Sequence, residues 1–148
     1  MPVSEIRFNS SFNQFGIVDD FGRVSVYEYT NKFKKVKVKG IENVSNGILS
    51  CCDIEPRDGK FIASGGVDTK ISVLEINPNA IRGEKVSFMK KHVELSGHGG
   101  AITSLRFLDS QFLVSASDDS KIMLWDLERP ERYLVKYDDH IVQVASLD

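Results

Sequence analysis

The chain has 148 residues, of which 41% are hydrophobic and 27% are charged, as is usual for a soluble globular domain. Its formal net charge of −2 excludes a general electrostatic attraction to nucleic acid or to an anionic membrane surface. No apolar run approaches the roughly 18 residues of a membrane-spanning helix, and the N-terminus lacks the basic-then-apolar layout of a secretory signal. We therefore expect a cytoplasmic protein that does not insert into membranes.

The N-terminal part of the chain contains four short runs in which apolar and polar residues alternate, a pattern that predicts β-strands. These runs are Val3–Phe8, Gln14–Asp19, Arg23–Tyr29 and Phe33–Gly40. The last run lies in a basic cluster, "NKFKKVKVKG". We interpret this cluster as a solvated outer strand whose lysines discourage edge pairing. Contact with acidic lipid headgroups is the alternative interpretation.

The middle of the chain repeats this layout with Leu49–Ile54, Phe61–Gly66 and Lys70–Ile76. The segment Asn77–Lys91 carries a proline, a glycine and several charges, and we expect a long loop followed by part of an outer strand.

Two adjacent cysteines lie in the predicted strand Leu49–Ile54. Neighbouring residues of a strand point to opposite faces. Cys51 and Cys52 are therefore predicted to be buried free thiols, not a metal clamp or a disulfide.

The C-terminal part contains a third set of runs, at Ile102–Phe107, Phe112–Ser117, Lys121–Leu127 and Tyr133–Tyr137. The start of a fourth set follows. His140 precedes the apolar Val144 by four positions, as His98 precedes Ile102. The residues 140–148 are therefore predicted to open another unit.

Three of these runs share one layout: "RVSVYEY", "KISVLEI" and "KIMLWDL". In this alignment Trp125 corresponds to Leu74 and Tyr27, while the turn residue Asp119 corresponds to Asp68 but to Phe21 in the first copy. Four short strands in each of several repeated units are typical of a β-propeller. We predict an all-β fold of about three four-stranded blades in a single partial domain. The repeats cover residues 3–30, 48–77 and 98–128, and a fourth begins at 140–148.

The third unit resembles the WD-repeat family. The residues that carry the resemblance are Gly97-His98, Ser115 to Ser117, Asp119 and Trp125-Asp126. The resemblance implies a buried hydrogen-bonded set formed by His98, Asp119, Trp125 and either Ser115 or Ser117. The implied role of this set is structural, because a buried carboxylate is costly unless hydrogen-bond donors satisfy it.

Within this family, Glu94–Glu128 and Ser50–Asn77 resemble blades of the β subunits of heterotrimeric G proteins. Those proteins bind an α subunit and effectors through loops on one face of the propeller. The resemblance therefore implies protein partners, including G-protein α and γ subunits, and a peripheral position at the inner face of the plasma membrane. By resemblance the partner-binding positions are Ser4, Ile48, Ser50, Val67, Ala101 and Gln143.

Except for Val67, a conservative replacement of a leucine, these positions also depart from the family pattern. Ala101 replaces an aromatic residue, Gln143 an acidic one, and Ile48 and Ser50 replace a tryptophan and a methionine. Aromatic anchors typically carry about 2 kcal/mol or more each in protein interfaces. Their loss favours a second hypothesis, in which the chain is a WD-repeat scaffold subunit of another multi-protein assembly.

The sequence offers no catalytic or cofactor set. The pair Asp118-Asp119 is interpreted as a turn, since aspartate accepts local backbone hydrogen bonds. The three histidines lack metal-ligand spacing, and Gly97–Gly100 is not a phosphate-binding loop. We therefore predict a non-enzymatic protein with no cofactor.

The number of units raises a separate question, since a propeller closes its sheet edges with about four to eight blades. A row of about three leaves apolar faces at both ends. We expect either a fragment of a longer propeller or closure by self-association.

Overall fold

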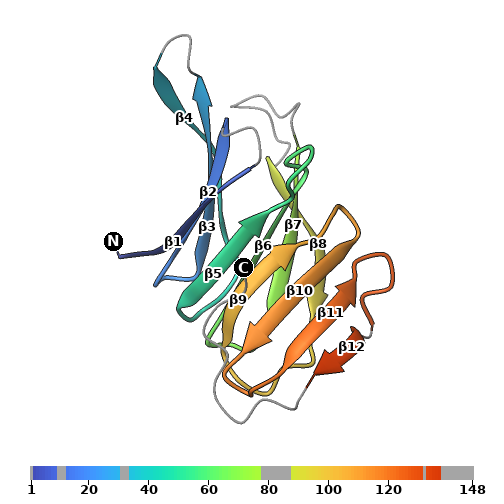
Figure 1. The fold of residues 1–148 in the computed structure, drawn as a ribbon. Coiled ribbons are helices and arrows are strands. Elements are labelled where there is room, and N and C mark those ends of the chain that lie inside the picture. The colour runs from blue at the N-terminus through green and yellow to red at the C-terminus, as the bar shows by residue number, and fades with distance from the viewer. Residues whose placement is uncertain (1, 10–12, 31–33, 78–87, 132, 138–148) are drawn as a thin grey trace.

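The structure of the chain, a computed structural model, describes residues 2–9, 13–30, 34–77, 88–131 and 133–137 (Figure 1). The regular elements of these segments are all β-strands, which confirms the all-β prediction. Twelve strands form three antiparallel four-stranded sheets, here called blades 1, 2 and 3. None of these described segments contains a helix long and apolar enough to cross a membrane.

Each blade is a meander in which strands adjacent in sequence pair with each other. Blade 1 consists of β1 (Val3–Phe8), β2 (Gln14–Asp19), β3 (Arg23–Thr30) and β4 (Lys35–Asn43). Blade 2 consists of β5 (Leu49–Ile54), β6 (Phe61–Gly66), β7 (Ile71–Ile76) and β8 (Met89–Leu95). Blade 3 consists of β9 (Ile102–Phe107), β10 (Phe112–Ser117), β11 (Ile122–Asp126) and β12 (Tyr133–Tyr137).

The strand predictions are confirmed for the inner three strands of every blade, with shifts of one residue at some ends. The outer strand of blade 1 differs, because it starts at Lys35 and continues to Asn43, where the prediction ended at Gly40. The reason is pairing, since β4 follows the whole of the eight-residue β3 from Thr30 back to Arg23. The predicted loop after Asn77 falls mostly on residues 78–87, and the predicted fourth unit on 140–148; both lie outside the described residues.

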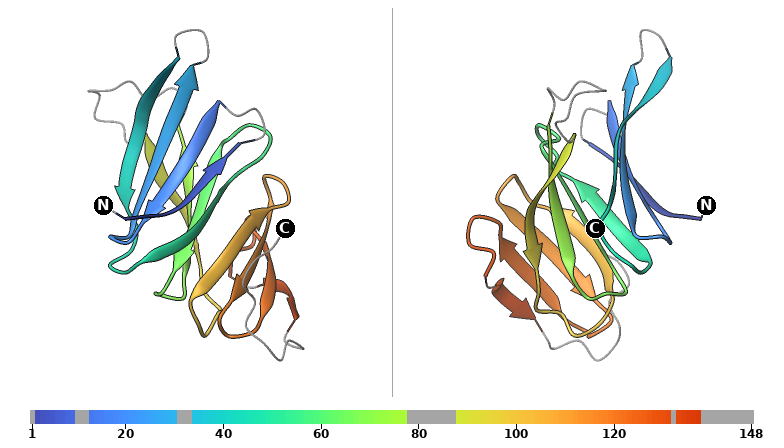
Figure 2. Two further views of the ribbon diagram at one scale, coloured as in Figure 1. Left: turned by 60° about the vertical axis from the view of Figure 1, so that its left-hand side comes forward. Right: turned by 180° about the vertical axis from the view of Figure 1, so that it is seen from behind.

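The blades stack face to face, so that β5 lies beside both β1 and β9 (Figures 1 and 2). One apolar cluster fills the space between blades 1 and 2 and includes Val18, Ile54 and Ile62. A second fills the space between blades 2 and 3 and includes Leu113 and Trp125. Each blade interface is therefore a core in its own right.

The two cysteines show how one strand serves both clusters. Cys51 belongs to the cluster shared with blade 3, and Cys52 belongs to the cluster shared with blade 1. Both are buried and free. Their side chains lie on opposite faces of β5, as the alternation of a strand requires.

The blades repeat even in their irregularities. A register shift occurs between the third and fourth strands at Val26/Tyr27, Val73/Leu74 and Leu124/Trp125, which are equivalent positions. The turns between the second and third strands place one residue each in the left-handed region, at Gly22, Thr69 and Ser120, with φ of 79°, 69° and 65°. Because bulges and left-handed residues reshape a strand end locally, their recurrence shows that the three units share one backbone design.

Candidate functional site

Four side chains of blade 3 form a chain of hydrogen bonds. Trp125 Nε1 lies 2.8 Å from Ser115 Oγ, and Ser115 Oγ lies 2.7 Å from His98 Nε2. His98 Nδ1 in turn lies 2.9 Å from Asp119 Oδ2. The loop before β9 supplies His98, β10 and β11 supply Ser115 and Trp125, and Asp119 lies in the turn between those two strands. The structure thus brings together residues that are up to 27 positions apart in the sequence.

The chemistry of the donors sets the direction of this chain. An indole N–H can only donate, so Ser115 Oγ accepts from Trp125 and has its own proton free for His98 Nε2. In the neutral imidazole the remaining proton is then on Nδ1, which donates to the Asp119 carboxylate. Every polar atom of the path therefore has a partner, which is the condition for burying a polar network without a penalty.

Asp119 ends the path and also shapes the turn. Its Oδ2 accepts the N–H of Gly99 at 2.8 Å, and its Oδ1 accepts the N–H of Lys121 at 3.0 Å. Burial by itself raises the pKa of this carboxyl, but the hydrogen bonds from Gly99 and His98 outweigh it and hold the pKa below its ordinary value. The fifth expected residue, Ser117, is not in the path: its hydroxyl accepts the Asp119 N–H at 3.1 Å and supports the same turn.

Blade 2 carries an altered version of this set, which the sequence analysis missed. Ser45 precedes Leu49 by four positions, as His98 precedes Ile102, and its hydroxyl lies 3.1 Å from Asp68 Oδ2. That shared four-residue spacing was the sequence signal that could have identified Ser45 as the counterpart of His98. The equivalent of Ser115 is Ser64, and its buried hydroxyl has no hydrogen-bond partner among the described residues.

In blade 1 a different aspartate accepts the backbone hydrogen bonds of the turn between the second and third strands. Phe21 stands where blade 3 has its turn aspartate, but Asp19, two positions earlier, accepts the backbone N–H groups of Phe21 and Arg23 at 2.9 and 3.1 Å. The Arg23 guanidinium pairs with the same carboxylate at 2.8 Å. Burial opposes ionisation of Asp19, but its hydrogen bonds with Arg23 lower its pKa overall.

One end of the blades forms a continuous surface, here called the loop face. It consists of the β2–β3, β6–β7 and β10–β11 turns and the loops that lead into β5 and β9. Backbone hydrogen bonds join these segments, from Ser45 N to Gly22 O, from Val67 N to Ile48 O and from Asp118 N to Ala101 O. The loop into β5 is therefore tied to the turns of blades 1 and 2, and the β10–β11 turn is tied to the loop into β9.

The expected partner-binding residues differ in how far they are exposed on the loop face. Ile48 and Val67 are brought together and are 45% and 51% exposed. Ser50 is exposed, and its hydroxyl donates to Ile102 O at 2.6 Å, whereas Ala101 is half-buried. Ser4 is exposed and donates to Asp20 Oδ1 at 2.8 Å. Gln143 lies outside the described residues.

The loop face contains one further apolar residue that the sequence analysis did not assign to it. Phe21 is 58% exposed in the β2–β3 turn, with the Arg23 guanidinium 5.4 Å from its ring centroid. Its position in the repeat, where the other units have aspartate, was the available signal.

A family model described as "WD domain, G-beta repeat" matches residues 89–126, which include β8 to β11 and all four members of the hydrogen-bonded path. This segment is a WD40 repeat. The three blades around it have the fold of an incomplete WD-repeat propeller, as predicted.

The chain also resembles two curated proteins over part of its length. It is 37% identical to Protein HIR1 of Kluyveromyces lactis over 86 residues, a match that covers 52% of this chain and 10% of that protein. It is 30% identical to guanine nucleotide-binding protein subunit beta-1 of Drosophila melanogaster over 92 residues, covering 62% of this chain and 25% of that protein. The match thus spans at most a quarter of the length of either relative.

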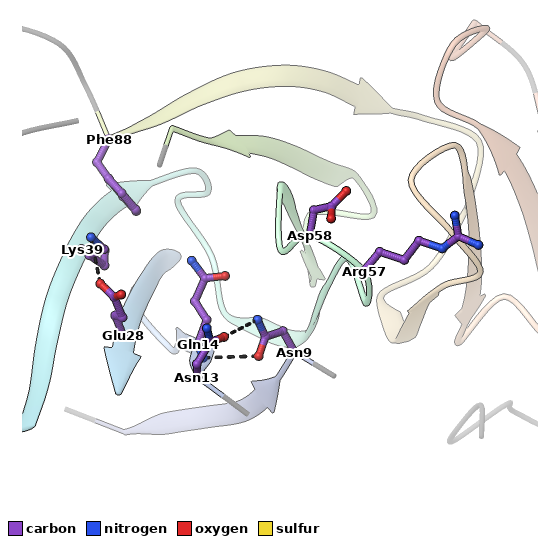
Figure 3. Close-up of a pocket in the computed structure, with 8 residues that line it drawn as sticks. All are labelled: Asn9, Asn13, Gln14, Glu28, Lys39, Arg57, Asp58 and Phe88. Carbon is purple, nitrogen blue, oxygen red and sulfur yellow. Dashed lines mark hydrogen bonds and ion pairs between the residues drawn. The ribbon is translucent and has the colours of Figure 1, made fainter. Parts of the chain in front are cut away.

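The end of the blades opposite the loop face holds a polar groove of about 310 Å³ between blades 1 and 2 (Figure 3). Asn9 donates to Asn13 at 2.8 Å on one side, and Lys39 pairs with Glu28 at 2.9 Å on the other. Arg57 projects from the β5–β6 loop nearby. The two asparagines are thus paired with each other, as are Lys39 and Glu28.

The described segments were also compared with the requirements of a metal site. They contain no cluster of three or more histidine, cysteine or acidic side chains able to hold a metal ion. Asp119, the acidic residue that the sequence placed beside Asp118, is engaged by His98 and by backbone donors.

Proposed function

We propose that this chain is a non-enzymatic protein-interaction module that binds a partner protein through its loop face. The observation that carries this proposal is the apolar pair Ile48 and Val67, which lies side by side and half exposed on a hydrogen-bonded layer. Exposed apolar side chains that cluster on a rigid support are typical of protein interaction sites.

The support for these two residues is as important as their exposure. Val67 N donates to Ile48 O at 3.1 Å, and Ser45 ties the preceding loop to Asp68 at 3.1 Å and to Gly47 N at 3.1 Å. A surface that is already ordered loses little conformational freedom on binding. More of the gain from burying Ile48 and Val67 therefore remains as affinity.

For the partner we propose a G-protein α subunit, with the chain acting as part of a G-protein β subunit in receptor signalling. The support is the 30% identity to guanine nucleotide-binding protein subunit beta-1 and the place of Ile48 and Val67 on the loop face. In this role a γ subunit is a second partner. The chain would then work in the cytoplasm, at the inner face of the plasma membrane.

A second candidate is a scaffold subunit of another multi-protein assembly. It is favoured by the 37% identity to Protein HIR1 and by Ala101, which is half-buried and small where an aromatic anchor was expected. Both candidates use the same loop face, and they differ in the protein that covers it.

The test is binding of the purified chain to an immobilised G-protein α subunit, compared among single substitutions. Ile48→Glu and Val67→Glu should each weaken binding tenfold or more, because a charge would be buried in the contact. The control is Leu108→Glu, which changes a side chain that is 59% exposed at the opposite end of blade 3. It should leave binding unchanged.

All three variants should keep the wild-type circular dichroism spectrum and melting temperature. The scaffold role would be selected by two results together. The wild-type chain would bind no α subunit, and it would cross-link to another protein that Val67→Glu no longer cross-links. Equal partner binding by wild type, Ile48→Glu and Val67→Glu would reject the loop face itself.

A further inference from the structure

Three exposed apolar side chains of the loop face lie on neighbouring segments of blades 1 and 2. Phe21 belongs to the β2–β3 turn, Ile48 to the loop into β5 and Val67 to the β6–β7 turn. Their side chains are 58%, 45% and 51% exposed. All three belong to the described ranges 13–30 and 34–77, between blade 1 and blade 2. We call these three residues the apolar patch.

Two glycines account for the close approach of the three segments. A Cβ atom on Gly22, the residue after Phe21, would overlap the loop into β5 and lie 3.0 Å from the Gly47 carbonyl oxygen. A Cβ atom on Gly47, the residue before Ile48, would lie 2.7 Å from Val67 Cγ2. Because a residue without a Cβ allows such contacts, the members of the apolar patch stand on backbone segments that touch one another.

The Phe21 ring takes no part in holding its own turn. The backbone N–H groups of that turn donate to Asp19 at 2.9 and 3.1 Å, and the ring lies beside the Arg23 guanidinium, 5.4 Å from its centroid. The equivalent residues of the other blades are Asp68 and Asp119, which accept backbone hydrogen bonds in their turns. An exposed aromatic ring thus replaces a turn-forming carboxylate, and exposed aromatic rings are typical anchors of protein interfaces.

Two carboxylates border the apolar patch, since each of the two turns carries an aspartate next in sequence to its apolar residue. Asp20 is half-buried and accepts the Ser4 hydroxyl at 2.8 Å. Asp68 is exposed and accepts the Ser45 hydroxyl at 3.1 Å. Because hydroxyl donors are neutral, they hold the carboxylates in place without cancelling their charge.

The cations of the same two turns are paired with other carboxylates. The Arg23 guanidinium lies 2.8 Å from Asp19 Oδ2, and Lys70 Nζ lies 3.5 Å from Glu94 Oε1. The apolar patch therefore has an acidic border. Such a border favours a partner that carries basic residues beside its apolar ones. It disfavours a second copy of this chain or an anionic lipid surface, because like charges would then be brought together.

We propose that the apolar patch receives a segment of a partner protein in which large apolar side chains are accompanied by lysine or arginine. Phe21 is the aromatic anchor of this contact, and Ile48 and Val67 complete the apolar surface. The basic side chains of the partner pair with Asp20 and Asp68. This role rests on the function proposed above, since it requires that a protein covers the loop face, and it adds the chemistry of that protein.

The experiment uses three synthetic peptides of equal length that carry the same fluorescent label and the same central phenylalanine and leucine. Lysine, serine or glutamate residues flank the central pair. Fluorescence anisotropy with the purified 148-residue chain should show the lysine peptide binding about tenfold or more tighter than the serine peptide. The glutamate peptide should not bind. The preference for lysine should shrink as salt is added, because salt screens exposed charges.

Substitutions then assign the contact to its residues. Phe21→Ala should weaken binding of the lysine peptide about tenfold or more. Asp68→Asn should reduce the preference for the lysine peptide and leave binding of the serine peptide unchanged. The control is Leu108→Ala, which shortens an exposed side chain at the opposite end of blade 3 and should bind like the wild type. All three variants should keep the wild-type circular dichroism spectrum.

Three results would each overturn the proposal: no binding of any peptide, equal binding of the lysine and glutamate peptides, or equal binding by wild type and Phe21→Ala. Such a failure is distinct from failure of the proposed function. If Val67→Glu still weakens binding to an α subunit, the loop face remains the partner site and only the roles of Phe21 and the acidic border are rejected. If the peptides behave as expected and no α subunit binds, the apolar patch stands and the scaffold role is favoured.

Discussion

Ser64 and Ser115 hold equivalent positions in adjacent blades, and both are buried, yet their hydroxyls have different surroundings. Ser115 Oγ lies 2.8 Å from Trp125 Nε1 and 2.7 Å from His98 Nε2. Ser64 Oγ has no hydrogen-bond partner among the described residues, because Ser45 and Leu74 replace the histidine and the tryptophan. Ser45 is turned to Asp68, and a leucine side chain cannot donate.

This difference predicts opposite results for the same substitution. Ser115→Ala leaves the indole N–H and His98 Nε2 without their partner, and should lower the free energy of unfolding by about 1–3 kcal/mol. Ser64→Ala removes a buried hydroxyl that has no partner in the described structure, and should leave the free energy of unfolding unchanged or raise it. Urea unfolding of the two variants beside the wild type measures both. Equal losses would show that the two hydroxyls have equivalent surroundings.

Asp119 makes part of the stability dependent on pH. Its pKa is lower in the folded chain than in the unfolded chain, so its contribution is fully present above the unfolded value and is lost as pH falls through the folded value. Asp119→Asn should cost about 2 kcal/mol at pH 7. The difference from wild type should shrink below about pH 4. Urea unfolding across this pH range measures it, and a difference that stays constant down to pH 2 would contradict the assignment.

Gly65 marks a close approach between blades 2 and 3. A Cβ atom at this position would lie 2.8 Å from Ile102 Cβ, at the root of a branched side chain that cannot move aside. Gly65→Ala should therefore destabilise the chain by about 1–3 kcal/mol. The matched control is Gly99→Ala, because a Cβ there has nothing within 4 Å. Its melting temperature should equal that of the wild type, and a similar shift in both variants would argue against this interface.

The thiols of Cys51 and Cys52 should be unreactive until the blades separate. Burial raises the pKa of Cys51 to about 12 and that of Cys52 well above its ordinary value, and thiolate is the reactive form. We expect no reaction of the folded chain with Ellman's reagent at pH 8 over minutes, and reaction of both thiols after unfolding in urea. Rapid labelling of one thiol without denaturant would show that one blade interface opens.

Much of the blade architecture could be predicted from local pattern. The alternation in "FLVSAS" and "FIASGG" has the period of a strand, and the turn residues between them act through their own backbone. For this reason β6 and β10 were predicted with the bounds that the structure shows. The spacing of His98, Asp119 and Trp125 likewise repeats a known design, so their meeting did not require knowledge of the fold.

Other features depended on what lies against each strand. The sequence by itself determined which residues form strands and turns, because those preferences act between neighbours in the chain. Only the tertiary structure decided that Phe15 and Tyr27 are half-buried while Ile62 and Leu74 at the same positions are buried. It also decided that the Ser64 hydroxyl has no hydrogen-bond partner among the described residues. Burial and hydrogen bonding are properties of the contact between blades, and an apolar alternation is the same whether or not another blade covers it.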